Sequence, residues 1–244
     1  MNKKSFLIIL LFCATFFISS CQNGSKTTEI VLKSLEAHGG IKKWESIKEI
    51  SYLKTTILYD SLGNVEKKIV QKHKNIFSPK FRAEMNWTED SIHKRVVLRD
   101  DKITVYFDDL LQNDPKLQEK YYKAVIAANY VIWQPYKLLD KDVTLSYSGE
   151  EIIDGKSVSV IKANYFNNDG SPANTWWYYF DQKTNKLVGN MVHHGTTYSY
   201  IENLHYENKT GLLLNAERKS YMTDSLRNIK FLRAHYFYEA WEQK

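Results

Sequence analysis

The sequence predicts an α+β fold in which a strongly curved antiparallel sheet of about eleven strands carries helices on one face. Aromatic residues make up 14% of the chain and 17 of them are Tyr, whereas only 10 Gly and 4 Pro occur. Such a composition is typical of sheet rather than of disorder. From residue 49 onward, short alternating segments are separated by turn residues, as in an antiparallel meander. Only two blocks of helical periodicity accompany them.

The first helical block lies before the strands. Residues 28–38 carry apolar side chains at near-helical spacing, with Thr27 or Thr28 as N-cap. The pair Gly39-Gly40 supplies the positive φ that ends a helix. Residues 41–47, with Trp44, predict one further short helical turn.

The second helical block separates two groups of strands. Asp114 is a good N-cap, and Pro115 suits the first helical position. The helix should end near residue 134, since Pro135 disfavours helix before it. Strands are expected between residues 50 and 107 and again between 143 and 241, with separate segments at 143–148 and 150–153.

The N-terminal segment has the features of a signal peptide. Lys3 and Lys4 precede an apolar run over residues 6–18, which is shorter than the roughly 20 residues of a membrane span. The sequence Ile18-Ser19-Ser20-Cys21 then resembles the lipobox of bacterial lipoproteins, whose cysteine becomes the acylated first residue. An ordinary signal peptide with an incidental cysteine is the alternative.

The resemblance to a lipobox divides the chain into three parts. Residues 1–20 are expected to form the signal peptide, residues 21–27 the lipidated Cys21 with a short tether, and residues 28–244 a single domain. The tether would reach on the order of 20 Å. In lipoproteins, Asp after the cysteine favours the inner membrane, so Gln22 implies the outer membrane, and we expect the periplasmic side. The acylated Cys21 would make the membrane a partner.

Charge and cysteine usage exclude several classes of function. The full chain carries a formal net charge of +6 at pH 7. Removal of Lys3 and Lys4 with the signal peptide leaves a net charge of +4, and the charged residues are dispersed along the sequence. This dispersion and the expected compartment both argue against a nucleic acid partner. We also expect a monomer. Cys13 is expected to leave with the signal peptide and Cys21 to be acylated, so no thiol would remain for a disulfide, a nucleophile or a zinc site.

The histidines and serines give no positive signal for catalysis. His193 and His194 would point to opposite faces of a strand, so they could not share one metal ion. Four others, His73, His93, His205 and His235, fall on separate strands. The sequence contains no Gly-x-Ser-x-Gly elbow and no phosphate-binding loop. We expect no enzyme, metal or cofactor, although a dispersed Ser-His-Asp triad stays an alternative.

Three stretches together resemble a group of uncharacterised bacterial lipoproteins. They are Ala37-His38-Gly39-Gly40 with Trp44 and Ile47, the segment Trp133 to Leu139, and Tyr178-Tyr179-Phe180-Asp181 with Thr184 and Leu187. The same element order is similar, more distantly, to the lipoprotein carrier and receptor proteins LolA and LolB. That resemblance implies a half-open β-barrel capped by helices, with an apolar concavity for acyl chains. A tethered chain suits a receptor or holder better than a carrier that crosses the periplasm.

The aromatic run over residues 176–180 is the strongest candidate for a ligand-lining strand. On a strand, Trp176, Tyr178 and Phe180 would face one side, and Trp177 and Tyr179 the other. We therefore expect a lipid-anchored protein that holds an acyl chain, a lipid or a lipoprotein tail; an interaction or sensing module with a filled core is the alternative. The candidate lining residues are Trp87, Trp133, Tyr136, Trp176, Trp177, Tyr178, Tyr179 and Phe180.

Overall fold

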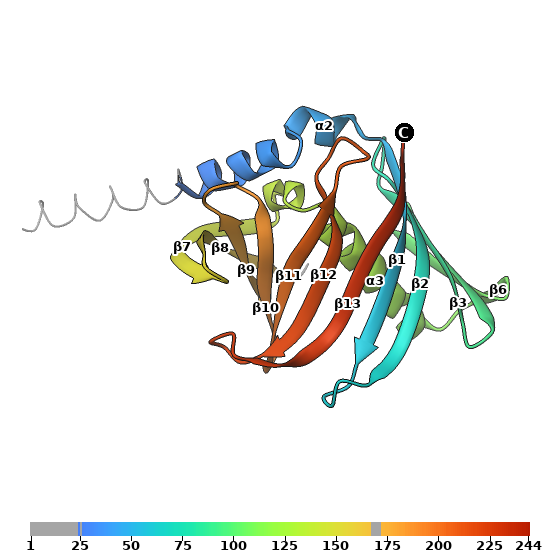
Figure 1. Cartoon of the computed structure of the whole chain (residues 1–244). Coiled ribbons are helices and arrows are strands. Elements are labelled where there is room, and N and C mark those ends of the chain that lie inside the picture. Colours follow the sequence, from blue (N-terminus) through green and yellow to red (C-terminus); the bar gives the residue numbers. More distant parts are fainter. Residues whose placement is uncertain (1–23, 25, 167–171) are drawn as a thin grey trace, which may run out of the picture.

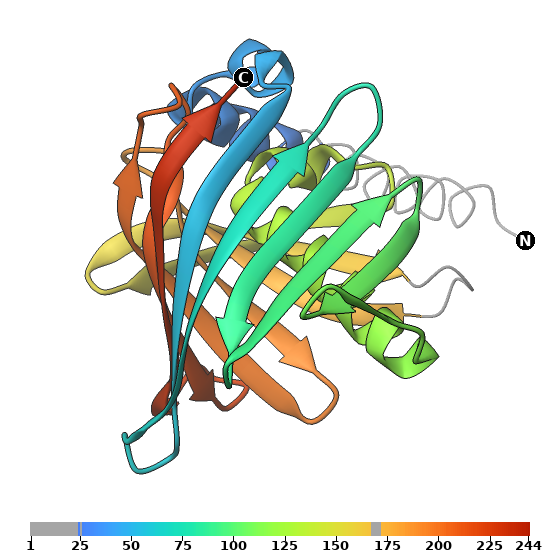
Figure 2. The same cartoon turned by 90° about the vertical axis from the view of Figure 1, so that its right-hand side faces the viewer.

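A computed structural model describes residue 24, residues 26–166 and residues 172–244, and within these residues one antiparallel sheet of thirteen strands organises the chain. The strand order is β6-β5-β4-β3-β2-β1-β13-β12-β11-β10-β9-β8-β7 (Figure 1). Every strand pairs with its neighbour in sequence, except that β1 also pairs with β13 and β6 is not paired with β7. The sheet curls around a concave side without closing (Figure 2). The predicted α+β class, a curved antiparallel sheet accompanied by a few helices, is confirmed.

The strands follow the chain in two runs. The first run contains β1 (Glu49–Tyr59), β2 (Val65–Ile76), β3 (Arg82–Glu89), β4 (Ile92–Arg99), β5 (Lys102–Phe107) and β6 (Leu110–Gln112). The second run contains β7 (Val143–Ile153), β8 (Lys156–Phe166), β9 (Pro172–Asp181), β10 (Leu187–His194), β11 (Thr197–Glu207), β12 (Leu214–Thr223) and β13 (Ile229–Gln243).

The expected count of about eleven strands is too low, and the structure differs from the expected strands at two places. Strand β6 is only three residues long, so it is too short to show an alternating pattern, and it forms because it pairs with β5. The segments 143–148 and 150–153 are one strand, β7. Its register with β8 shifts between Tyr147 and Gly149, and Gly149 has φ +112°. This bulge bends the strand without ending it.

The helices begin and end largely where the sequence indicates. The N-terminal helix covers residues 26–37 and is followed by α2 (Ile41–Ser46). It begins within the expected tether, before Thr28. Helix α3 (Pro115–Ile132) has Asp114 as N-cap, whose carboxylate accepts a hydrogen bond from the Lys116 backbone N–H at 2.9 Å. A 3-10 turn, η1 (Tyr136–Leu139), follows it.

Helix α3 lies on the concave side of the sheet, against β3, β4 and β5 (Figure 2). The N-terminal helix and α2 lie across one end of the sheet, beside the C-terminus (Figure 1). None of the helices in the described part of the chain is long and apolar enough to cross a membrane. The expected signal peptide, residues 1–20, lies outside the described residues.

Three buried clusters stabilise this arrangement. One joins the N-terminal helix, α2 and the end of α3 to the sheet around Trp44 and Tyr178. A second lies between α3 and β3–β5 around Val96 and Val105. The third, around Val160 and Tyr179, lies on the opposite, convex face. Beside these clusters, the concave face from β9 through β13 to β1 borders a hollow.

Candidate functional site

A cavity of about 470 Å³ lies between α3 and the uncovered part of the concave face. Three alanines of α3 line it, and their short side chains leave space between the helix and the sheet. From α3 the cavity is lined by Ala124, Ala127, Ala128 and Val131. From the sheet it is lined by Tyr52, Lys54, Trp176, Asn190, Val192, His194, Ser199, Ile201, Arg218, Ser220, Arg233, Tyr236 and Tyr238.

The pairing of the strands explains why these side chains meet. Arg218 of β12 pairs with Tyr236 of β13, which pairs in turn with Thr56 of β1. Residues that pair directly point to the same face, and alternate residues along each strand do so too. The alternation therefore brings Lys54, Arg218 and Tyr236 to the concave side from three adjacent strands.

The two walls of the cavity differ in chemistry. The helix wall is apolar, and Val192, Ile201 and Trp176 continue it along β9–β11. The wall formed by β1, β12 and β13 carries the cations Lys54, Arg218 and Arg233. None of the described residues that line the cavity is acidic.

Arg218 is the most buried of these cations, with 3% of its surface exposed. Its Nε donates a hydrogen bond to Asn203 Oδ1 at 2.9 Å, and Asn203 Nδ2 donates to the Leu187 carbonyl at 2.7 Å. No carboxylate among the described residues forms an ion pair with Arg218. Arg233, in contrast, pairs with Glu66 and donates to the Tyr59 carbonyl. The Arg218 charge is therefore held in place but not neutralised.

The aromatic strand alternates as predicted, and only one of its residues lines this cavity. Trp176 does so, stacked at 6.0 Å on Tyr178. Tyr178 and Phe180 share its face but are buried in the core cluster around Trp44. Trp177 and Tyr179 lie on the convex face, where the Arg227 guanidinium is 4.9 Å from the Tyr179 ring.

The remaining predicted lining residues lie elsewhere. Trp87 packs on Tyr121 beneath α3, and its indole N–H donates to Glu89 at 3.1 Å. Trp133 and Tyr136 line a separate cavity of about 510 Å³ beside α2 and contact Trp44. Cys21 lies outside the described residues.

Sequence reasoning missed the polar side of the cavity, namely Lys54, Asn190 and Arg218. Each is a polar residue within a strand, and only the curvature of the sheet shows that the three surround one hollow. The alanines of α3 carried a usable signal, because Ala124, Ala127 and Ala128 repeat along a helix that otherwise buries large side chains. Small residues on the inner side of a helix indicate space.

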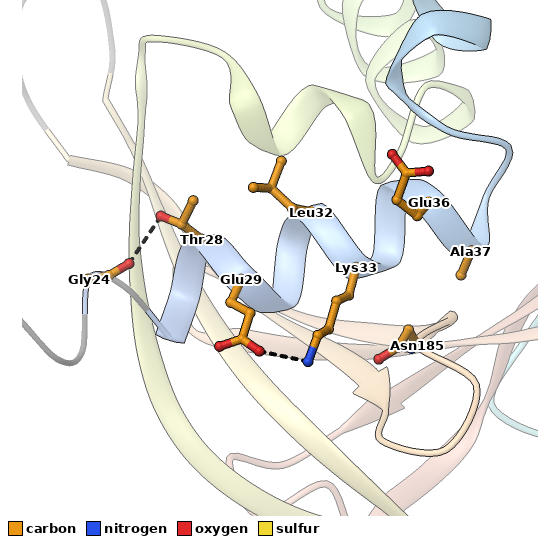
Figure 3. A pocket seen from close by; sticks show the side chains of 8 residues that line it. All are labelled: Gly24, Thr28, Glu29, Leu32, Lys33, Glu36, Ala37 and Asn185. Carbon is orange, nitrogen blue, oxygen red and sulfur yellow. Dashed lines mark hydrogen bonds and ion pairs between the residues drawn. The ribbon is translucent and has the colours of Figure 1, made fainter.

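A second hollow runs along the outer side of the N-terminal helix (Figure 3). It measures about 830 Å³, but every residue that lines it is exposed or half-buried. Glu29 and Lys33 form an ion pair of 2.6 Å on the helix surface. Such exposed pairs contribute little free energy, and none of the described residues that line the groove is a buried polar group. We therefore take the concave cavity as the candidate site.

The histidines do not form a metal centre in the described part of the chain, where no group of three potential ligands converges. His193 stacks on Tyr198 and His194 lines the concave cavity, so the two point to opposite faces as predicted. His205 and His235 both hydrogen-bond the Glu217 carboxylate, at 2.6 Å each. These hydrogen bonds hold the Glu217 pKa below its usual value.

Comparisons with known proteins agree with this fold. A model of a family of unknown function (DUF6503) matches residues 3–210. No curated protein sequence matches the chain.

Three solved structures are similar over most of their length. A LolA superfamily protein from Nitrosomonas europaea is 10% identical, with 89% of this chain and 93% of that chain covered and a TM-score of 0.56. A DUF1329 family protein from Desulfovibrio piger is 8% identical, with the same coverage and TM-score. A putative outer membrane lipoprotein-sorting protein domain from Vibrio parahaemolyticus is 9% identical. The match covers 91% of this chain and 94% of that chain, with a TM-score of 0.52. The predicted likeness to the LolA fold is confirmed.

Proposed function

This chain belongs to the DUF6503 family, a family of unknown function, and we propose that it is a lipid-anchored envelope protein that holds an apolar ligand. The observation that carries the proposal is the cavity of about 470 Å³ between α3 and the concave face of the sheet. Binding sites for small molecules typically measure about 300–1,000 Å³. The ligand class is an acyl chain, a lipid or the lipid tail of another protein.

The apolar wall of the cavity supplies the driving force for binding. Ala128, Val131, Val192 and Ile201 present aliphatic surface from the helix and the sheet. Burial of such surface contributes about 25 cal/mol per Å². Trp176 adds a large rigid ring at one side. Binding of this kind requires no cofactor and no bond cleavage, so we propose a holder rather than an enzyme.

The expected anchor supports a role close to the membrane. Acylation of Cys21 would tie the protein to lipid, and the first helix has begun by residue 26. Five residues span at most about 18 Å, so the domain would stay near the membrane surface. The fold is also shared with proteins of the LolA superfamily and of lipoprotein sorting. We propose the periplasmic side of the outer membrane.

Native mass spectrometry of residues 22–244 tests this proposal. All described elements lie in residues 24–244, so this chain keeps every contact reported above. We expect a co-purified apolar molecule. Ala128→Phe should fill the cavity and remove the bound mass, whereas Lys123→Phe, at an exposed position of the same helix, should keep it. Absence of bound mass, together with no uptake of added dodecanol, would favour an interaction module instead.

A further inference from the structure

The buried charge of Arg218 calls for an anionic partner that no described residue provides. A guanidinium removed from water loses hydration free energy, which a carboxylate normally restores. Here the side chain is 3% exposed, and within the described residues its only hydrogen bond goes to the neutral Asn203. Asn203 occupies Nε, so the Nη1 and Nη2 edge of the guanidinium is left for another acceptor.

A second cation, Lys54, lines the same wall of the cavity as Arg218. Lys54 Nζ is 5.2 Å from the centre of the Tyr236 ring, and Tyr236 is the direct strand partner of Arg218. Tyr236 therefore lies between the two cations. Lys54 forms no ion pair with any described residue. Strand β13 separates β1 from β12, so the backbones that carry the two cations are roughly 10 Å apart. Both side chains line the same cavity, where one anionic group would be attracted by both positive charges.

Asn190 gives independent support for a polar ligand group. It lines the same cavity and has no exposed surface, and neither its amide nitrogen nor its amide oxygen has a hydrogen-bond partner among the described residues. Buried amides in native proteins are almost always hydrogen-bonded. Asn190 pairs with Ile201, two residues from Asn203, the residue that holds Arg218. The Asn190 amide and the Arg218 guanidinium thus belong to one region of the cavity.

We propose that the cavity binds an amphiphile with one anionic group, a carboxylate or a phosphate, which accepts hydrogen bonds from the Nη edge of Arg218. Lys54 adds charge attraction, and the hydrocarbon part lies against α3 and the aliphatic residues of β10 and β11. Two parallel N–H groups match the paired oxygens of a carboxylate or phosphate. This inference rests on the proposed function and specifies which end of the ligand the β12 wall recognises.

Calorimetric titration of residues 22–244 with dodecanoate, dodecyl phosphate, 1-dodecanol and inorganic phosphate tests the proposal. These compounds distinguish the contribution of the anionic group to affinity from that of the hydrocarbon chain. We expect both anionic amphiphiles to bind at least about tenfold more tightly than dodecanol, and inorganic phosphate to bind much more weakly than dodecyl phosphate. Arg218→Met should weaken the binding of the anionic amphiphiles by about 10- to 100-fold and leave the affinity for dodecanol unchanged. Lys54→Met, at a half-buried position, should weaken them by a smaller factor. Arg99→Met, at an exposed site outside the cavity, is the matched control and should change none of these affinities.

Each contrary result points to a different failure. Equal affinity for dodecanoate and dodecanol, unaffected by Arg218→Met, would overturn the anionic recognition and leave apolar holding intact. No binding of any dodecyl compound would overturn the proposed function itself. If inorganic phosphate bound as tightly as dodecyl phosphate, the cavity would be a site for free anions, and the proposal of an amphiphilic ligand would be overturned. Retained dodecanol binding by Arg218→Met shows that this variant is folded.

Discussion

His38 joins the end of the N-terminal helix to Leu187 at the start of β10. Its Nε2 accepts a hydrogen bond from the Leu187 backbone N–H at 3.1 Å, while its Nδ1 donates to the Leu213 carbonyl at 2.6 Å. The Leu187 carbonyl in turn accepts from Asn203, which holds Arg218. Both ring nitrogens are used, so the neutral form of His38 is required. A continuous set of hydrogen bonds thus connects the helix end to the cavity wall.

Acid should destabilise the fold through His38. Burial lowers its pKa from 6.5 to about 4, opposed in part by the Leu213 hydrogen bond. Between these two pKa values the unfolded chain binds more protons than the folded one. The stability that the neutral His38 ring contributes is therefore complete above pH 6.5 and is lost as the pH falls toward 4. The loss would amount to about 3 kcal/mol. Urea unfolding between pH 7.5 and 4.5 measures it.

The variant His38→Gln should show a flatter dependence of unfolding free energy on pH. Some dependence should persist, since burial and the positive charge of Lys54 lower the pKa of His73 to about 3. His93→Gln, at an exposed position, is the control and should keep the wild-type curve. An unchanged curve in His38→Gln would contradict the role given to this ring.

Substitution of Gly39 should damage the helix end for two reasons that can be separated. Gly39 has φ +114°, and an added Cβ would meet the Gly211 carbonyl oxygen at 2.7 Å. Gly63 also has a positive φ, +87°, but a Cβ there meets nothing within 4 Å. Gly63→Ala should lower the free energy of unfolding by about 1 kcal/mol through backbone strain alone. Gly39→Ala should lower it by distinctly more, because the added Cβ also meets the Gly211 carbonyl. Equal losses in chemical denaturation would rule out the steric contribution.

A chain of hydroxyl groups should make Tyr178 sensitive to loss of its oxygen. Tyr130 donates to the Lys137 carbonyl at 3.0 Å, so Tyr165 must donate to Tyr130 and Tyr178 to Tyr165. Tyr178 then accepts from Gln134 Nε2 at 3.1 Å. Tyr178→Phe leaves the buried Gln134 amide unsatisfied, which should cost about 1–3 kcal/mol.

A matched hydroxyl removal is available on the convex face. The Tyr198 hydroxyl forms no hydrogen bond with any described residue, and its ring stacks on His193 at 4.3 Å. Tyr198→Phe should therefore change the free energy of unfolding by less than about 0.5 kcal/mol. A loss in Tyr178→Phe no larger than in Tyr198→Phe would show that the hydroxyl chain contributes nothing to stability.

The expected lipid anchor can be tested in cells without reference to the fold. Cys21→Ala removes the only thiol of the expected lipobox, so the chain should no longer incorporate labelled palmitate and should keep its first twenty residues. Cys13→Ala, within the expected signal peptide, should be lipidated normally. Continued labelling of Cys21→Ala would exclude acylation at this position.

Local sequence patterns determined the order and type of the elements. Asp114 followed by Pro115 marked the start of α3, Gly39-Gly40 marked the end of the first helix, and alternation along β9 separated Trp176 from Trp177. Each of these features depends on residues close together in the chain, where backbone sterics and side-chain period act directly.

Only the tertiary structure decided where the hollow lies and what surrounds it. Lys54, Asn190 and Arg218 come from strands far apart in sequence, and β1 reaches β12 only because β13 pairs between them. The aromatic run over residues 176–180 contributes side chains to the core, to the convex face and to the cavity lining. The burial of each side chain depends on which elements pack against its face of the sheet. Curvature and helix placement are collective results of packing, so no single stretch of sequence encodes the cavity.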